Sequence, residues 1–256
     1  MKKTGIIIQA RMGATRLPNK VMKDLGGKPE LEQVFDRCKM ADVNEVIIAT
    51  SDNKENDIIE EFCRERGINC FRGSEEDVLD RFYKTALEYG LDIIIRITGD
   101  CPLISPEVIN KAIKEFNEGN ADYLSNAAKR SYPRGLDVEI FSFKTLEAVH
   151  QLAKEEPERE HVTAFIYNNP ETFRIGHLTA DDWIKHPEIR LCLDTQEDLD
   201  LLTIIYNSLK VTKTTPIREV INFLLEHPEL IKINNKSEIE QLNKNRIEGV
   251  KQRLAM

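Results

Sequence analysis

Two kinds of hydrophobic segment alternate along the first part of the chain. Continuous apolar runs without polar alternation occupy Thr4–Ala10, Glu45–Thr50 and Asp92–Thr98, as is typical of strands buried on both faces. The longer stretches between them place Leu, Val, Ile and Phe at helical spacing over Leu31–Met40, Glu55–Glu65 and Glu75–Tyr89, with a short strand before the last of these. This order predicts an α/β fold: a three-layer, Rossmann-like and mostly parallel sheet with helices on both faces.

The second half of the chain predicts a less regular region in which the sheet becomes mixed. Strands are expected at Asp122–Ser125, Leu136–Phe141, Phe173–Leu178 and Ile189–Leu193, and helices at Ser142–Ala153 and Pro157–Asn168. Ser105-Pro106-Glu107 has the form of a helix start, with a cap, a proline at the first helical position and an acid in the first turn. That helix is expected to run to about Glu118. Thr195-Gln196-Glu197-Asp198 has the form of a capping box.

Two more helices are predicted beyond Lys210. They cover Pro216–Glu226 and Ser237–Leu254, and the second carries its apolar residues on one stripe. No repeat, low-complexity tract or Gly/Ser linker separates them from the rest. We therefore expect one domain over residues 1–210 with a C-terminal helical extension of the same domain over residues 211–256, packed on the core or on another subunit.

Composition narrows the class of protein. The 256 residues are 41% hydrophobic, and 36 Lys and Arg against 44 Asp and Glu give a net charge of −8. This balance favours a soluble globule and disfavours non-specific nucleic-acid binding, which needs a strong positive field. No apolar run is long enough to span a bilayer, and the run behind Lys2 and Lys3 ends too early for a signal peptide. A cytoplasmic protein without nucleic-acid or membrane partners is expected.

The cysteines indicate free thiols. There are five, an odd number, and no pair has the C-x-x-C spacing of a redox motif or zinc site. We expect buried or idle thiols in a reducing compartment, with neither a disulfide framework nor structural zinc.

The first candidate site follows the first strand, because ligands of open α/β sheets bind outside the carboxyl ends of the strands. The segment QARMGATRLPNK, residues 9–20, carries Arg11, Arg16 and Lys20 in an otherwise acidic chain. Guanidinium and ammonium groups at this position suit a triphosphate. A solvated basic loop is the alternative. No G-x-x-x-x-G-K-[ST] or G-x-G-x-x-G motif is present, which disfavours kinase and dehydrogenase functions.

Two acids follow later strands. Asp100 stands beside Gly99 after the most apolar strand, where its oxygens are suited to hold Mg²⁺ against phosphates. The alternative is a turn-forming Asp before the Ser105 cap. Asp194 follows a later run, and its alternative role is a helix N-cap, which Thr195 is equally able to fill.

At these three loops the chain resembles a known family. QARMGATRLPNK, TGDCPLI (98–104) and LDTQEDL (193–199) are similar to signature segments of the cytidylyltransferases that activate acidic sugars, the CMP-Kdo and CMP-sialate synthetases. FRGSEEDVLDRFYKTA (71–86), YPRGLDVEIFS (132–142) and EREHVTAFIYNNP (158–170) resemble the branch named for the spore coat polysaccharide biosynthesis protein SpsF. The resemblance spans roughly residues 4 to 205 and implies a nucleotidyltransferase (GT-A-like) fold.

The resemblance also implies an activity and its residues. CMP would pass from CTP to an acidic sugar or sugar-phosphate-like acceptor with release of pyrophosphate, in a homodimer. The implied nucleotide-binding residues are Ala10, Arg11, Arg16, Lys20, Asp52, Arg72, Gly73, Thr98 and Gly99. Arg16, Lys20 and Asp100 are the implied catalytic residues, and Asp100 and Asp194 the implied Mg²⁺ ligands. Many Kdo-type enzymes have Gln-Gly-Asp-Glu-Pro where this chain has Thr98-Gly99-Asp100-Cys101-Pro102.

The acceptor is expected at two neighbouring polar segments. Their groups suit sugar hydroxyls and a carboxylate or phosphate, and His161 is placed to orient the acceptor or act as a base. The candidates are Tyr132, Arg134, Asp137, Glu139, Arg159, Glu160 and His161. A solvated helix face and one side of a strand are the alternative interpretation.

Two rival functions remain open. A glycosyltransferase on a similar fold commonly carries a D-x-D metal motif, and the nearest match here is Asp137-Val138-Glu139. A non-catalytic nucleotide-binding subunit of a polysaccharide pathway would bind CTP without turnover.

Overall fold

A seven-stranded sheet forms the centre of the computed structural model, which describes residues 2–235. Its order is β3-β2-β1-β4-β6-β5-β7. The strands are β1 (Thr4–Gln9), β2 (Glu45–Ser51), β3 (Asn69–Gly73), β4 (Ile93–Thr98), β5 (Tyr123–Ser125), β6 (Glu139–Ser142) and β7 (Ile175–His177). Only β6 among these runs antiparallel to its neighbours. The predicted mostly parallel sheet, mixed in its second half, is confirmed.

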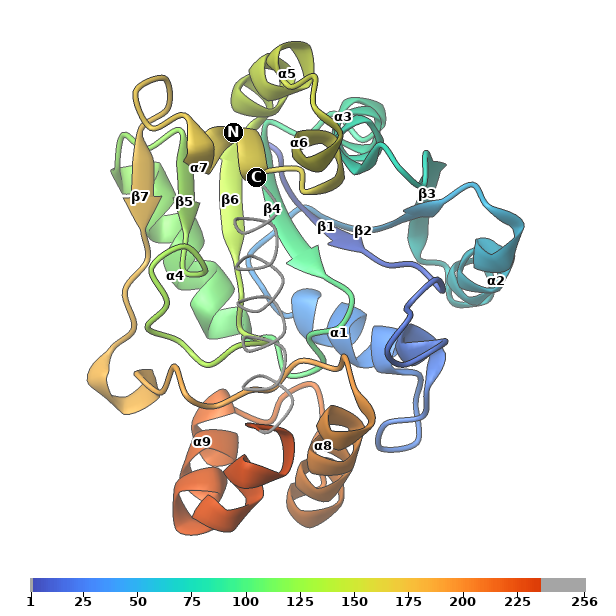
Figure 1. Cartoon of the computed structure of the whole chain (residues 1–256), viewed down its shortest axis with the longest axis vertical. Helices are drawn as coiled ribbons and strands as arrows, with labels where there is room; N and C mark the ends of the chain where they lie inside the picture. Colours follow the sequence, from blue (N-terminus) through green and yellow to red (C-terminus); the bar gives the residue numbers. More distant parts are fainter. Residues whose placement is uncertain (1, 236–256) are drawn as a thin grey trace, which may run out of the picture.

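Helices cover both faces of this sheet and make the three layers (Figure 1). One face holds α1 (Glu30–Cys38), α2 (Asp57–Arg66), α4 (Pro106–Glu118), α8 (Gln196–Leu209) and α9 (Ile217–Glu226). The other holds α3 (Val78–Glu88), α5 (Phe143–Leu152), α6 (Glu156–Glu160) and α7 (Ala164–Asn168). Short 3-10 turns are η1 (Lys20–Met22), η2 (Lys54–Asn56) and η3 (Asp182–Ile184). Because both faces are covered, Ile6 and Ile8 enter one core and Ile7 the other.

Predicted helix starts agree with the structure. Ser105 caps α4, its Oγ accepting from the Val108 backbone, with Pro106 as the first helical residue. Thr195 and Asp198 form the capping box of α8. These local signals place the loops that precede both helices at the carboxyl edge of the sheet.

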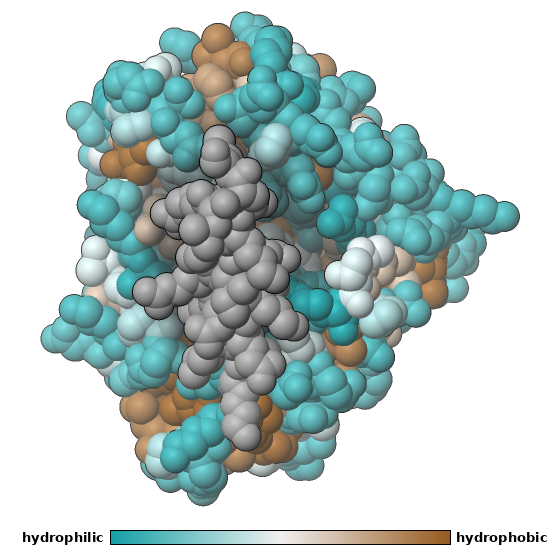
Figure 2. Space-filling model, viewed as in Figure 1, coloured by the Kyte–Doolittle hydropathy of each residue, from teal (hydrophilic) through white to brown (hydrophobic). Residues whose placement is uncertain are grey.

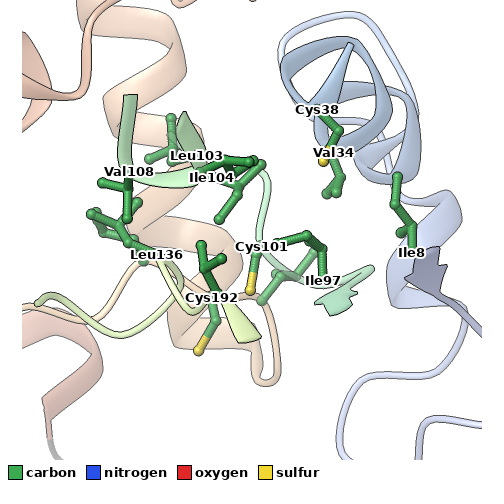
Figure 3. Packing of buried hydrophobic residues seen from close by; sticks show 14 of the residues in the cluster. Ile8, Val34, Cys38, Ile97, Cys101, Leu103, Ile104, Val108, Leu136 and Cys192 are labelled. Atoms are coloured by element: carbon green, nitrogen blue, oxygen red, sulfur yellow. The ribbon is translucent and has the colours of Figure 1, made fainter. Parts of the chain in front are cut away.

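The larger core lies between the sheet and α1, α4 and α8. Figure 3 shows Ile97, Cys101 and Cys192 close together in this core, near Ile8 of β1. The five cysteines are free, and all but Cys70 are buried. The expectation of unpaired thiols is therefore confirmed.

The predicted strand Ile189–Leu193 is wrong. A single isolated bridge joins Arg190 to Arg134, and the segment enters no named strand. Gly135, with φ 98°, lies so close to the Leu191 backbone that a Cβ would stand 2.6 Å from its carbonyl carbon. Leu193 N in turn donates to Asp100 O. The apolar residues of the segment are buried, but its backbone is bonded to loops instead of a sheet edge.

The predicted helix Pro157–Asn168 is also wrong as one element. It is divided into α6 and α7 by a turn at His161–Thr163, where Val162 has a left-handed φ of 48°. In this turn Thr163 Oγ1 donates to Glu139, so the helix is interrupted where it meets a buried carboxylate.

The chain beyond residue 210 packs on the core as far as it is described. Ile217, Val220, Ile221 and Leu224 of α9 belong to the same apolar cluster as the sheet. Residues 228–235 are helical, and the predicted helix Ser237–Leu254 lies outside the described residues. Figure 2 shows hydrophobic surface over α8 and α9, with most of this face otherwise hydrophilic. None of the described helices is long and apolar enough to cross a membrane.

Candidate active site

The strand order reverses between β1 and β4, and ligands of open α/β sheets bind at such a point. Here a backbone hydrogen bond connects the end of β1 to the first residue of the loop after β4. Gly99 N donates to Gln9 O at 2.8 Å. A Cβ on Gly99 would lie 2.9 Å from that oxygen and 3.0 Å from the Ala10 Cβ, so only glycine permits this approach.

A cavity of about 290 Å³ opens above this junction. It is lined by most of the predicted nucleotide, catalytic and metal residues: Ala10, Arg11, Arg16, Lys20, Thr98, Gly99, Asp100 and Asp194. Gln9, Gly13, Ala14, Thr15 and Val21 complete the wall. The structure therefore brings the three predicted loops into one site.

Lys20 lies between the two predicted metal ligands. Its Nζ donates to Asp100 Oδ2 at 2.8 Å and to Asp194 Oδ1 at 2.5 Å. Burial by itself lowers the pKa of Lys20, but the charges of Asp100 and Asp194 outweigh it, and the pKa lies above its ordinary value. Burial likewise opposes the charge of Asp194, yet Lys20, Arg16 and Arg190 lower its pKa to about 2. Lys20 and Asp194 are thus both ionised at neutral pH.

Asp194 is oriented by residues that the sequence analysis missed. Arg190 Nη2 donates to Asp194 Oδ2 at 2.9 Å, and Arg190 also donates twice to Asp198, which is fully buried. Asn234 Nδ2 donates to Asp198 Oδ1 at 2.9 Å. Thr195 takes the N-cap role, because its Oγ1 accepts from Asp198 N, so the Asp194 side chain is left to face the cavity. The sequence showed Asp198 only as part of a capping box.

The loop after β1 is fixed by residues from other elements. Asn56, fully buried, accepts from Met12 N at 2.8 Å and donates to Ser51 Oγ at 3.0 Å. Arg11 Nη1 donates to Glu75 Oε1 at 2.9 Å. Neither Asn56 nor Glu75 was predicted, since the loop residues that they contact, Met12 and Arg11, lie more than 40 positions away in the sequence.

Asp52, Arg72 and Gly73 do not line the cavity. The Arg72 guanidinium pairs with Asp57 at 2.7 Å and with Glu60, and donates to the Ser51 and Asn53 carbonyls. Asp52 N donates to Gly73 O at 2.8 Å. In this conformation the three residues tie β2 to β3, and their nucleotide-binding role stays a prediction.

A second cavity of about 640 Å³ lies beside the first. The two are joined by a hydrogen bond of 3.1 Å from Arg96 Nη2 to Gln9 Oε1, because Arg96 lines the second cavity and Gln9 the first. Arg96 also pairs with Glu139, which accepts from Tyr123 Oη at 2.6 Å and Thr163 Oγ1 at 2.8 Å. Burial opposes the charge of Glu139, but Arg96 and the two hydroxyls hold its pKa below the ordinary value. The sequence did contain a signal for this cluster that was overlooked: Arg96 is a charged residue inside the apolar run of β4.

The predicted acceptor residues are distributed unequally around this cavity. Glu139 and His161 line it. The other five line neither cavity. Tyr132 is buried and its hydroxyl donates to Thr179 O, while Arg134 forms the backbone bridge to Arg190. Asp137 pairs with Arg130, Arg159 pairs with Asp77, and Glu160 is exposed.

The donor set is suited to a hard cation bound together with phosphates. Among residues 2–235 no group of three or more His, Cys, Asp or Glu side chains is gathered for a metal. Asp100 and Asp194, however, already share one positive charge through carboxylate oxygens. Mg²⁺ is commonly held by one or two carboxylates, waters and substrate phosphates, so these residues fit it.

Comparisons with known proteins identify the family of the chain. A family model described as cytidylyltransferase matches residues 5–248. The spore coat polysaccharide biosynthesis protein SpsF of Bacillus subtilis is 36% identical over 231 residues, covering 87% of this chain and 94% of that protein. A 3-deoxy-manno-octulosonate cytidylyltransferase of Saccharophagus degradans is 35% identical over 131 residues, covering 50% and 49%. The solved structure of a cytidylyltransferase from Leptospira borgpetersenii superposes with a TM-score of 0.85 at 33% identity, covering 90% and 97%.

Proposed function

Because the chain belongs to the cytidylyltransferase family, we propose that it transfers CMP from CTP to a hydroxyl of an acidic sugar or sugar-phosphate-like acceptor and releases pyrophosphate. The observation that carries the proposal is the position of Lys20 between Asp100 and Asp194, in a cavity that Arg11 and Arg16 also line. Cations for a triphosphate and carboxylates for a divalent ion meet there. The similarity to SpsF supports a role in polysaccharide biosynthesis.

The triphosphate would be bound by the loop after β1. Arg11 and Arg16 present guanidinium groups to its oxygens, and each such charge-assisted contact is worth roughly 1.5–3 kcal/mol. Ala10, Thr98 and Gly99 offer the tightly joined backbone against which a nucleotide is able to lie.

Asp100 and Asp194 would hold Mg²⁺. When bound, that ion neutralises phosphate charge and makes the attacking hydroxyl more acidic. Lys20 lies in the same cavity and would donate to the phosphates, where with Arg16 it would stabilise the charge that develops on the leaving pyrophosphate. Arg190 keeps its bond to Asp194 and holds that carboxylate in orientation.

The acceptor would occupy the second cavity, from which its hydroxyl reaches the α-phosphorus past Gln9 and Arg96. Glu139 is fixed in its ionised form, so it is suited to accept from an acceptor hydroxyl, with His161 at the rim. The glycosyltransferase alternative is less favoured, because Asp137 lines neither cavity while Glu139 lines the second, so the two acids of the Asp137-Val138-Glu139 segment do not meet at one site. Homodimerisation and a cytoplasmic location stay predictions.

Calorimetric titration with CTP, UTP, GTP and ATP tests the proposal without a known acceptor. We expect selective CTP binding that Mg²⁺ strengthens and a chelator weakens. Asp100→Asn is expected to lose the Mg²⁺-dependent part, whereas Asp181→Asn, an exposed acid outside both cavities, is expected to keep it. Equal or absent binding of all four nucleotides would overturn the proposal. Selective binding then justifies screening acidic sugars and sugar phosphates for pyrophosphate release.

A further inference from the structure

Four polar side chains form one row across the second half of the sheet. Arg96 of β4 is paired with Glu139 of β6, Glu139 with Ser125 of β5, and Ser125 with His177 of β7. Residues directly opposite one another on neighbouring strands project from the same face of a sheet. The next row on that face, Ile94, Phe141 and Tyr123, is largely apolar and belongs to the smaller core. Since burying polar groups costs free energy, we expect a function that explains why this row is polar where the next row is apolar.

Two cavities lie along this row. The cavity of about 640 Å³ covers Arg96 and Glu139, and another of about 440 Å³ is lined by His177, Lys129 and Phe173. They share Ala128 and Tyr167, so they form one trough from the Gln9–Arg96 contact to the edge strand β7. Three strand spacings of ~4.8 Å make the trough roughly 14 Å wide from Arg96 to His177.

The two ends of the trough differ in charge. At the inner end the positive charge of Arg96 is balanced by Glu139, which would repel an acceptor carboxylate placed beside it. At the outer end the exposed Lys129 lines the same cavity as His177. Burial and, to a lesser extent, the positive charge of Lys129 lower the pKa of His177. His177 Nδ1 is buried without a hydrogen-bond partner. Arg174, on the same wall, is paired with Asp122.

We propose that the outer cavity, at His177 and Lys129, is a distal acceptor subsite that binds an anionic substituent of an elongated acceptor. The reacting end of that acceptor lies over Arg96 and Glu139, and its far end carries a carboxylate or phosphate. Lys129 supplies the charge, His177 Nδ1 a directed hydrogen bond, and Tyr167 and Phe173 an apolar wall. The assignment rests on the proposed function, since it is the CTP cavity that makes the inner end the reacting end.

The test is an NMR titration of the isotope-labelled full chain, with inorganic phosphate in one arm and acetate in the other. We expect saturable shifts of the His177 ring and of the Ala128 and Lys129 amides. Lys129→Ala is expected to weaken the response at least tenfold. Lys144→Ala removes an equally exposed lysine outside both cavities and is expected to leave the response unchanged.

The outcomes separate this subsite from the proposed function. A response to phosphate alone assigns a phosphate substituent, and a response to both probes assigns a carboxylate as well. No saturable shift at His177 in either arm, or the same affinity after Lys129→Ala, overturns the subsite. CTP titrated into the same samples reports on the nucleotide cavity, so selective CTP binding without a probe response leaves the proposed function intact.

Discussion

Two clusters pair cations with carboxylates but are built differently. The Lys20 cluster consists of Lys20, Arg16, Asp100, Asp194 and Arg190, which lie in loops or at the start of η1. The Arg96 cluster consists of Arg96, Glu139 and Tyr123 on neighbouring strands, with Thr163. In the first, one carboxylate, Asp194, is shared by Lys20, Arg16 and Arg190, and the Arg16 side chain is 47% exposed. In the second, Glu139 is enclosed by Arg96 and by the hydroxyls of Tyr123 and Thr163, which are 1% and 2% exposed. A cluster with several cations and a solvent-facing member is able to exchange partners, whereas a cluster enclosed by buried residues holds its shape.

The contrast fits the two tasks that the proposed function assigns to the two cavities. A site that receives a triphosphate and a metal ion must release its internal ion pairs, and shared contacts make that release inexpensive. A surface that orients an acceptor gains from groups already fixed before the ligand arrives, because less ordering is left for binding.

Removing the carboxylate of the enclosed cluster is expected to have the largest effect. Glu139→Ala leaves the Arg96 charge buried without its counter-charge, and breaking a buried pair in this way costs about 3–5 kcal/mol. Urea denaturation measures the free energy of unfolding. Asp181→Ala, which breaks the more exposed pair with Lys111, is expected to cost less than about 1 kcal/mol. Equal losses in the two variants would show that the Arg96–Glu139 pair contributes no more to stability than an exposed pair.

Activity should depend most strongly on the exchangeable cluster. Lys20→Met is expected to lower turnover by about a hundredfold or more, equivalent to about 3 kcal/mol of transition-state stabilisation, with the fold retained. Pyrophosphate release with an acceptor found by the screen is the measurement. Lys23→Met, three positions on and outside the cavity, serves as the control and is expected to keep near-normal turnover. A well-folded Lys20→Met enzyme with full turnover would remove Lys20 from the mechanism.

Acid should weaken the exchangeable cluster as the pH falls from about 4 to about 2. The pKa of Asp194 is about 2 in the folded chain and 3.8 ordinarily, so the unfolded state binds the proton more readily. The stabilisation, about 2 kcal/mol, is present above pH ~4 and is lost as the pH falls towards 2. Urea midpoints compared between pH 6 and pH 2.5 should therefore fall more steeply in the wild type than in Asp194→Asn. Parallel slopes would contradict the assignment of the shift to Asp194.

The smallest effect expected is on metal affinity without nucleotide. Because Lys20 occupies the carboxylates, Lys20→Met should bind Mn²⁺ about tenfold more tightly, a change of ~1.4 kcal/mol. Electron paramagnetic resonance of free Mn²⁺ gives the dissociation constant, with Asp100→Asn as the variant expected to bind more weakly. If Lys20→Met bound Mn²⁺ no better than the wild type, Lys20 would not compete with the ion.

The sequence predicted those parts of the molecule whose signals are local. β1, β2 and β4 followed from apolar runs without alternation, and the loop bearing Lys20 followed because it comes directly after such a run. The segment Ile189–Leu193 was misassigned, because burial on a loop and burial in a strand give the same hydrophobic pattern.

What escaped prediction depends on partners far apart in the chain. Arg96 and Glu139 are 43 positions apart and become partners only through the antiparallel insertion of β6. Arg190 lay unnoticed in the predicted strand Ile189–Leu193, and Asp198 was predicted only as part of a capping box; the fold brings both to Asp194. That Asp100 and Asp194 would converge came from the family resemblance, since spacing alone does not bring them together.

Under the proposed function, the ammonium of Lys20 would also set an order of arrival. A bare divalent ion entering the cavity would have to displace a positive charge held by two carboxylates, and the displaced ammonium would then have no anion to turn to. An ion already complexed to a triphosphate would bring the anion with it, so the displaced ammonium would exchange one partner for another. A site built in this way would discriminate against stray metal and would admit metal and nucleotide as a single unit.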